Sequence, residues 1–166
     1  MKAEQIKEIH VGIAEYGVAR SPHRLLTLGL GSCVGVALYD PVFRVGGLAH
    51  VMLPDSTLFR DTGGKPAKFA DLAIKVLFRN LQSAGGRNGR VVAKLAGGAQ
   101  MFFGNSRAAQ MAVGERNIEA VRGVLKELGI VILAEDVGGN KGRTVILDTA
   151  DGSLTVRTLG LAEQVI

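Results

Sequence analysis

The chain has 166 residues, of which 47% are hydrophobic, enough for one domain with a buried core. Its single cysteine excludes an internal disulfide, so nothing indicates a secreted disulfide scaffold. The N-terminal stretch lacks the apolar core of a signal peptide, and no run reaches the roughly 18 apolar residues of a membrane span. We expect one domain over residues 1–166 in a soluble, cytoplasmic protein, without membrane insertion.

The formal net charge is +5, but the basic residues are spread along the chain and only 5% of residues are aromatic. Nucleic-acid-binding proteins usually show a basic stripe or stacking aromatic residues, so we expect no nucleic-acid partner. Two interpretations of the charge remain open. It is either a solvated basic surface or a surface that attracts an acidic partner.

Eight short apolar segments, many bounded by glycine pairs, have the composition of β-strands. They cover residues 9–19, 24–30, 34–40, 48–53, 91–97, 130–137, 143–149 and 153–159. Helical spacing of apolar residues predicts two helices, over 66–84 and 115–128. Because strands and helices do not alternate regularly, the pattern favours an α/β protein of the α+β type. We expect a mixed β-sandwich of about eight strands with two main helices packed outside.

The only cysteine, Cys33, lies in a bend of small residues within the stretch LGLGSCVG. It could be a buried, inert small hydrophobe, as free cysteines often are. It could also be a nucleophile. Glycine accepts positive φ, so a bend at Gly29, Gly31 and Ser32 could direct the backbone N–H groups of residues 31–33 at a developing oxyanion.

A cysteine hydrolase needs a histidine base near its nucleophile. Strand geometry selects His50 among the three histidines, because a hairpin with Pro41 in its turn places His50 opposite Cys33 or its immediate neighbour. We expect His10 and His23 on strand or loop surfaces. From the residues alone, His50 could equally be a hydrogen-bonded core histidine.

A third group must orient the imidazole, and no Asp or Asn has an obvious place. Thr27 lies six residues before Cys33, about 20 Å away in an extended chain, so it can join only if the chain reverses at Gly29–Gly31. The scattered histidines lack the spacing of metal ligands, and no phosphate-binding loop motif occurs. We therefore expect neither a metal nor a cofactor.

Four sequence blocks together resemble one protein family. They are TLGLGSCVGVALYDP, GGLAHVMLP, KLAGGAQMF (Lys94–Phe102) and the stretch from Gly114 to Arg143. Their order and spacing are similar to those of the chemoreceptor glutamine deamidases of bacterial and archaeal chemotaxis, the CheD family. The resemblance runs from about Ile9 to Arg143.

This resemblance implies an α/β sandwich related to bacterial toxin deamidases. It also implies a cysteine hydrolase that converts receptor glutamines to glutamates and releases ammonia. The corresponding catalytic residues are Cys33, His50 and Thr27. The implied partners are the cytoplasmic helices of methyl-accepting chemotaxis receptors and, in some members, a CheC-type phosphatase. Two alternatives remain: a regulatory binding module without chemistry, and a cysteine hydrolase of a small amide.

Overall fold

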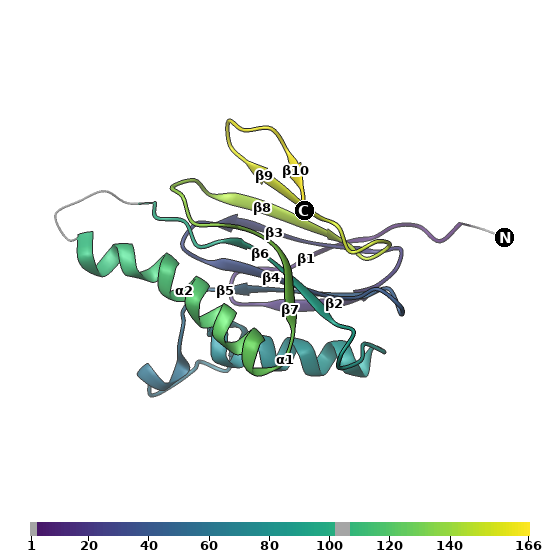
Figure 1. Ribbon diagram of the computed structural model, residues 1–166, viewed down its shortest axis with the longest axis horizontal. Coiled ribbons are helices and arrows are strands. Elements are labelled where there is room, and N and C mark those ends of the chain that lie inside the picture. Colours follow the sequence, from purple (N-terminus) through teal and green to yellow (C-terminus); the bar gives the residue numbers. More distant parts are fainter. Residues whose placement is uncertain (1–2, 102–106) are drawn as a thin grey trace.

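The computed structural model describes residues 3–101 and 107–166. Two five-stranded sheets pack face to face, and two helices cover the outer face of one of them (Figure 1). The described residues therefore form an α+β sandwich with two main helices, as predicted, with ten strands in place of about eight. None of the helices within this part of the chain is long and apolar enough to cross a bilayer.

The first sheet has the strand order β1-β3-β8-β9-β10 and the second has the order β2-β5-β4-β6-β7. Both sheets are mixed, because β1 pairs with β3 and β6 pairs with β7 in parallel while the other neighbours are antiparallel. The strands of the first sheet are β1 (Glu8–His10), β3 (Arg24–Leu30), β8 (Arg143–Asp148), β9 (Leu154–Thr158) and β10 (Gln164–Val165). Those of the second are β2 (Tyr16–Arg20), β4 (Val34–Asp40), β5 (Val45–Val51), β6 (Val92–Gly97) and β7 (Val131–Val137).

The helices are α1 (Ala70–Ser83) and α2 (Arg107–Glu127), and two short 3₁₀ turns cover Ser56–Leu58 and Pro66–Lys68. The helix predicted over 66–84 therefore begins with a 3₁₀ turn, and the one predicted over 115–128 begins earlier. Phe102, the last residue of the Lys94–Phe102 block, lies outside the described residues.

The segment predicted as one strand over 9–19 is instead divided between the sheets. β1 joins the first sheet and β2 joins the second, with a turn between them in which Ala14 has a φ of 60°. The apolar pattern continues through the turn because both strands border the same core. The sequence pattern therefore could not reveal the break.

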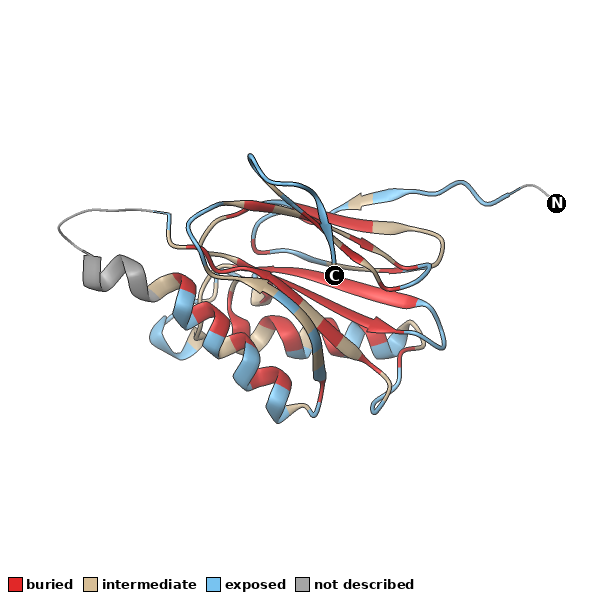
Figure 2. Ribbon diagram, turned by 45° about the horizontal axis from the view of Figure 1, so that its top comes forward, coloured by how far each residue is buried: buried red, intermediate tan, exposed pale blue. Residues whose placement is uncertain are grey.

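β4 and β5 are buried at every residue, because sheet covers one face of them and helices cover the other (Figure 2). Val34, Val36 and Leu38 face the core beneath the helices. Ala37 and Leu48 face the core between the two sheets. The continuous apolar run of β4 thus reflects a central strand in a three-layered molecule.

The chain passes from the first sheet to the second between β3 and β4, in the bend Gly31–Cys33. Before this crossing, the pairing of β3 with β8 shifts register between Thr27 and Leu30. Gly29 lies in the shifted segment with a φ of 70°, which glycine adopts without strain. The bend therefore places Cys33 against the core between the two sheets.

Candidate active site

Thr27 and His50 meet across the two sheets. Each lies two residues after a leucine of the inter-sheet core, Leu25 on β3 and Leu48 on β5, and side chains two apart on a strand share a face. Thr27 Oγ1 is 2.8 Å from His50 Nδ1. Thr27 is 1% exposed and His50 is fully buried, so water does not compete for this contact.

The hydrogen bonds of Thr27 determine the tautomer of His50. The Thr27 hydroxyl donates its only proton to the carbonyl oxygen of Val11, at 2.7 Å. Thr27 Oγ1 must therefore accept the second hydrogen bond, and His50 Nδ1 must carry a proton. This leaves Nε2 as the basic nitrogen of the neutral ring. Within the described chain, that buried Nε2 has no hydrogen-bond partner.

Cys33 precedes the strand that pairs with the strand of His50, but the register of this pairing differs from the expected one. The turn between β4 and β5 runs from Pro41 to Arg44, so His50 pairs with Gly35 rather than with Cys33 or its immediate neighbour. Cys33 precedes Gly35 by two residues and packs against the inter-sheet core. The thiol is free and partly exposed, and it makes no recorded hydrogen bond to His50 within the described residues.

Burial acts on the pKa of both groups in the direction of neutrality. It raises the pKa of the Cys33 thiol above its ordinary value, and the residue's own backbone N–H opposes this only in part. Burial also lowers the pKa of His50. Both shifts favour the uncharged form of each group in the resting protein.

Three successive carbonyl groups of the bend are held by hydrogen bonds. Gly31 O accepts from Ala99 N at 2.7 Å, and Cys33 O accepts from Gly98 N at 2.7 Å. Ser32 O accepts from the Asn117 amide at 2.9 Å. The Gly31 N–H donates to Gly29 O. Within the described chain, the N–H groups of Ser32 and Cys33 donate to no other residue, and the Cys33 N–H is directed at its own sulfur.

The bend can lie against the end of β6 only because glycine stands there. A Cβ on Gly97 would collide with the carbonyl oxygen of Cys33, and its φ of 111° is strained for any other residue. A Cβ on Gly98 would collide with Ile118, and one on Gly114 would lie 2.6 Å from Gly98 O. Glycines on both segments therefore let α2 approach the end of β6, against which the bend that carries Cys33 lies.

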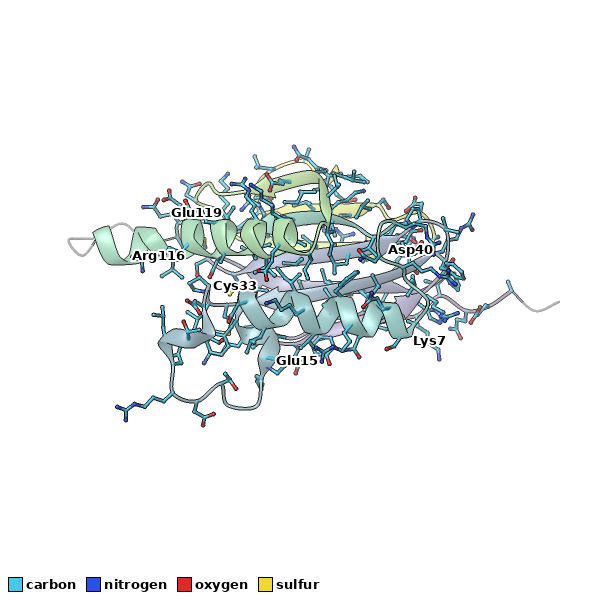
Figure 3. The ribbon with its side chains drawn as sticks, turned by 60° about the horizontal axis from the view of Figure 1, so that its bottom comes forward. Lys7, Glu15, Cys33, Asp40, Arg116 and Glu119 are labelled. Atoms are coloured by element: carbon cyan, nitrogen blue, oxygen red, sulfur yellow. The ribbon has the colours of Figure 1, made fainter. Side chains whose placement is uncertain are left out.

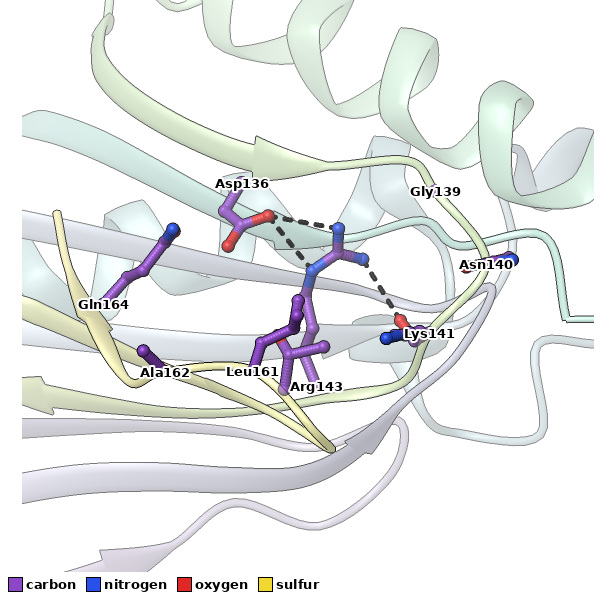
Figure 4. A pocket seen from close by; sticks show the side chains of 9 residues that line it. Asp136, Gly139, Asn140, Lys141, Arg143, Leu161, Ala162 and Gln164 are labelled. Atoms are coloured by element: carbon purple, nitrogen blue, oxygen red, sulfur yellow. Dashed lines mark hydrogen bonds and ion pairs between the residues drawn. The ribbon is translucent and has the colours of Figure 1, made fainter.

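Arg143 supports the same segment from the opposite side (Figure 4). Its Nε and Nη2 lie 3.2 and 3.1 Å from Asp136 Oδ1, and its Nη1 donates to the carbonyl oxygens of Gly97 and Lys141, each at 3.4 Å. Arg143 begins β8 and Asp136 lies on β7, so the pair joins the two sheets beside a polar pocket.

Sequence analysis missed Asn117, whose amide reaches the bend from α2. Asn117 is fully buried, and it lies next to Arg116, which Figure 3 labels on the same helix. One signal was available. Asn117 interrupts the apolar face that includes Ile118 and Val121, and a polar residue at a core position requires a partner.

The other two histidines lie apart from this site. His10 is exposed on β1, and His23 lies partly buried in a turn, where its Nδ1 accepts from Lys7 N. Within the described ranges, no three His, Cys, Asp or Glu residues are grouped so as to hold a metal ion. The structure thus brings Thr27 and His50 into contact, with Cys33 at the adjoining bend.

Comparison with known proteins identifies one family. The sequence profile described as "CheD chemotactic sensory transduction" matches residues 52–158. The chain is also 56% identical over 159 residues to a protein of Desulforamulus reducens, covering 96% of this chain and 95% of that one. A Moorella thermoacetica protein is 55% identical over 161 residues, with 96% of each chain covered. Both are named "Probable chemoreceptor glutamine deamidase CheD".

Likeness among solved structures is weaker. Neisseria meningitidis protein NMB0706 aligns with 81% of this chain and 64% of its own, at a TM-score of 0.48 and 9% sequence identity. This likeness is too distant to bear on function.

Proposed function

Because the chain belongs to the CheD family, we propose that it is a protein-glutamine deamidase, which converts glutamine side chains of chemoreceptors to glutamate and releases ammonia. The observation that carries this proposal is the state of His50. The ring is fully buried, its Nδ1–H is engaged by Thr27, and its basic Nε2 has no partner. A buried nitrogen without a partner costs free energy, which is expected where a base awaits a substrate or nucleophile.

Acylation begins when Nε2 of His50 takes the proton of the Cys33 thiol as the substrate binds. The thiolate forms a bond to the amide carbon of glutamine, and the carbonyl electron pair moves to oxygen. The tetrahedral intermediate then collapses and breaks the C–N bond. The proton on Nε2 passes to the leaving nitrogen, so ammonia departs and a thioester remains.

Stabilisation of the oxyanion is assigned to the N–H groups of Ser32 and Cys33. Neither donates to another residue in the described chain, and the carbonyls of Gly31 and Ser32 in the same peptide planes are held by Ala99 and Asn117. Donors fixed before the reaction stabilise developing charge without reorganisation. The Gly31 N–H is already engaged by Gly29, so it contributes to the shape of the bend instead.

Deacylation uses the same residues. His50 Nε2 takes a proton from water, and the hydroxide oxygen bonds to the thioester carbon. Collapse of this second intermediate breaks the C–S bond, and the Cys33 sulfur regains its proton from Nε2. Thr27 holds the ring in one tautomer through both halves of the reaction.

The position of the thiol favours a protein substrate over a small amide. Gly31, Ser32 and Cys33 are all partly exposed, which is consistent with approach by a side chain of another protein from outside. The cytoplasmic helices of chemoreceptors are substrates that could approach the site in this way. A CheC-type phosphatase as partner stays a prediction, which co-purification of the two proteins would test.

The test incubates the protein with recombinant cytoplasmic fragments of chemoreceptors. Mass spectrometry would detect conversion of glutamine to glutamate, and a coupled assay would detect ammonia. We expect both with the wild-type chain and neither with Cys33→Ala, whose fold is checked by circular dichroism. Ammonia release by a folded Cys33→Ala protein would contradict the mechanism. Binding without conversion by the wild-type chain would favour the non-catalytic regulatory module.

A further inference from the structure

We propose that Asn117 is a positioning residue that fixes the direction of the Cys33 backbone N–H, and so builds one donor of the oxyanion site from helix α2. This inference rests on the proposed function. Its structural part concerns the peptide plane between Ser32 and Cys33, whose orientation can be measured independently of activity.

The first step is the hydrogen bonding of the Asn117 amide. Nδ2 donates to Ser32 O and to Met52 O, each at 2.9 Å. Ser32 precedes the nucleophile, and Met52 follows His50 by two residues. One side chain therefore ties the bend that carries Cys33 to the end of the strand that carries the base.

The second step follows from peptide geometry. A trans peptide is planar, and its C=O and N–H point in opposite directions. When Asn117 holds the Ser32 carbonyl, it also sets the direction of the Cys33 N–H. The preceding plane is held in the same way, because Ala99 N–H holds Gly31 O and so directs the Ser32 N–H. Within the described residues, the carbonyls of Gly31 and Cys33 are held by backbone N–H groups, and only that of Ser32 is held by a side chain.

The third step is the cost of keeping an amide at this position. Asn117 is fully buried, and its Oδ1 has no hydrogen-bond partner in the described part of the chain. An unpaired buried acceptor destabilises a fold. Neighbouring positions of the same helix face are apolar, so packing alone does not require an amide here.

Close packing of α2 against the end of β6 fixes the position from which the Asn117 side chain reaches the bend. Gly114 lies one helical turn before Asn117, and its missing side chain allows α2 to approach Gly98 and Ala99, the segment that holds the other two carbonyls. All three carbonyl contacts of the bend thus come from one packed unit. A shift of the Asn117 side chain would change one peptide plane without moving the thiol's other supports.

The experiment compares wild type, Asn117→Ala and a matched control, Thr149→Val. Thr149 is also fully buried, and its hydroxyl donates to the carbonyl of His23 at the opposite end of β3. Kinetics with a glutamine-containing receptor fragment are measured at a temperature where circular dichroism shows all three proteins folded. Alkylation of Cys33 by iodoacetamide is measured in parallel, because this displacement forms no oxyanion.

For Asn117→Ala we expect kcat to fall about 100-fold, the size of effect caused by small misplacements of catalytic groups, while KM changes little. Iodoacetamide should label Cys33 at nearly the wild-type rate. Thr149→Val should lose stability but keep its kcat. An unchanged kcat in folded Asn117→Ala would overturn the proposal, and so would a parallel loss of kcat and alkylation, which would indicate general disorder of the bend.

A second measurement separates this inference from the proposed function. In ¹⁵N-resolved NMR spectra, Asn117→Ala should shift the backbone amide signal of Cys33 and leave that of Ser32 much less affected. If the wild-type chain deamidates no receptor fragment, the proposed function fails while this readout still decides the role of Asn117. An unshifted Cys33 amide would overturn the inference whatever the activity.

Discussion

Replacing Thr27 by valine removes one oxygen and keeps the shape of the side chain. In the folded protein that oxygen accepts from His50 Nδ1 at 2.8 Å and donates to Val11 O at 2.7 Å. Thr27→Val therefore leaves two groups unpaired, the Nδ1–H and the Val11 carbonyl, in a place where Thr27 is only 1% exposed.

The expected loss of stability follows from these two groups. Each buried polar group left unpaired costs about 1–3 kcal/mol, so the free energy of unfolding should fall by about 2–6 kcal/mol. Thr27→Ser is the matched control. It keeps both hydrogen bonds and loses one buried methyl group, which costs about 1 kcal/mol.

The expected loss of activity follows from the tautomer. Without an acceptor at Thr27, nothing holds the proton on Nδ1, and the ring is free to turn. Loss of a carboxylate that orients a catalytic histidine lowers kcat about 10⁴-fold. A neutral hydroxyl stabilises the imidazolium less, so we expect Thr27→Val to lower kcat about 10- to 100-fold.

The assay is ammonia release from a receptor fragment, with urea unfolding measured on the same preparations. Thr27→Ser should retain most of the activity and Thr27→Val should not. If folded Thr27→Val matches the kcat of Thr27→Ser, the hydroxyl does not orient the base, and the assignment of Thr27 to the site is wrong.

Three further predictions follow from the same geometry. Iodoacetamide should label the partly exposed Cys33 in the native protein, with a rate that rises with pH through an apparent pKa above that of a free cysteine; a lower apparent pKa would contradict the neutral resting pair. Because the folded-state pKa of His50 lies below the unfolded value of about 6.5, the stability it confers is present above that pH and is lost as pH falls. Urea midpoints at pH 8 and 5 should therefore differ less in His50→Gln than in wild type, and equal differences would refute this. Gly97→Ala should lower the free energy of unfolding by at least about 2 kcal/mol, because it combines a positive φ with a backbone collision, whereas Gly123→Ala, which meets only open space on α2, should not; equal urea midpoints would argue against the close approach at Gly97.

Sequence reasoning succeeded where the structural signal is local. Apolar runs bounded by glycines located β3, β4, β6 and β8 closely, because strand composition and turn residues are properties of neighbouring positions. The bend before Cys33 was readable for the same reason. Family motifs pointed to His50 and Thr27 as well, but the residues alone left a core histidine equally open.

Tertiary structure decided which groups meet. Thr27 and His50 lie on different sheets, and their contact depends on how the sheets face each other, which no local periodicity encodes. The register of the β4–β5 hairpin differs from expectation because Asp40 pairs with Val45, which centres the turn between Val42 and Phe43 and places Gly35 opposite His50. A pairing register depends on turn length, and the apolar run of β4 is uniform enough to accept either.

Charge states and backbone directions also came only from the folded chain. The thiol of Cys33 has a raised pKa because burial removes water, and burial is a property of packing. Ala99 and Asn117 hold the carbonyls of Gly31 and Ser32, and this fixes the directions of the Ser32 and Cys33 N–H groups in the same peptide planes. The sequence by itself thus located most of the strands and both helices, although it joined β1 and β2 into one segment and did not reveal β10. The packing of three layers decided which ring nitrogen of His50 carries the proton and which groups hold the carbonyls of the bend, because those depend on contacts between distant residues.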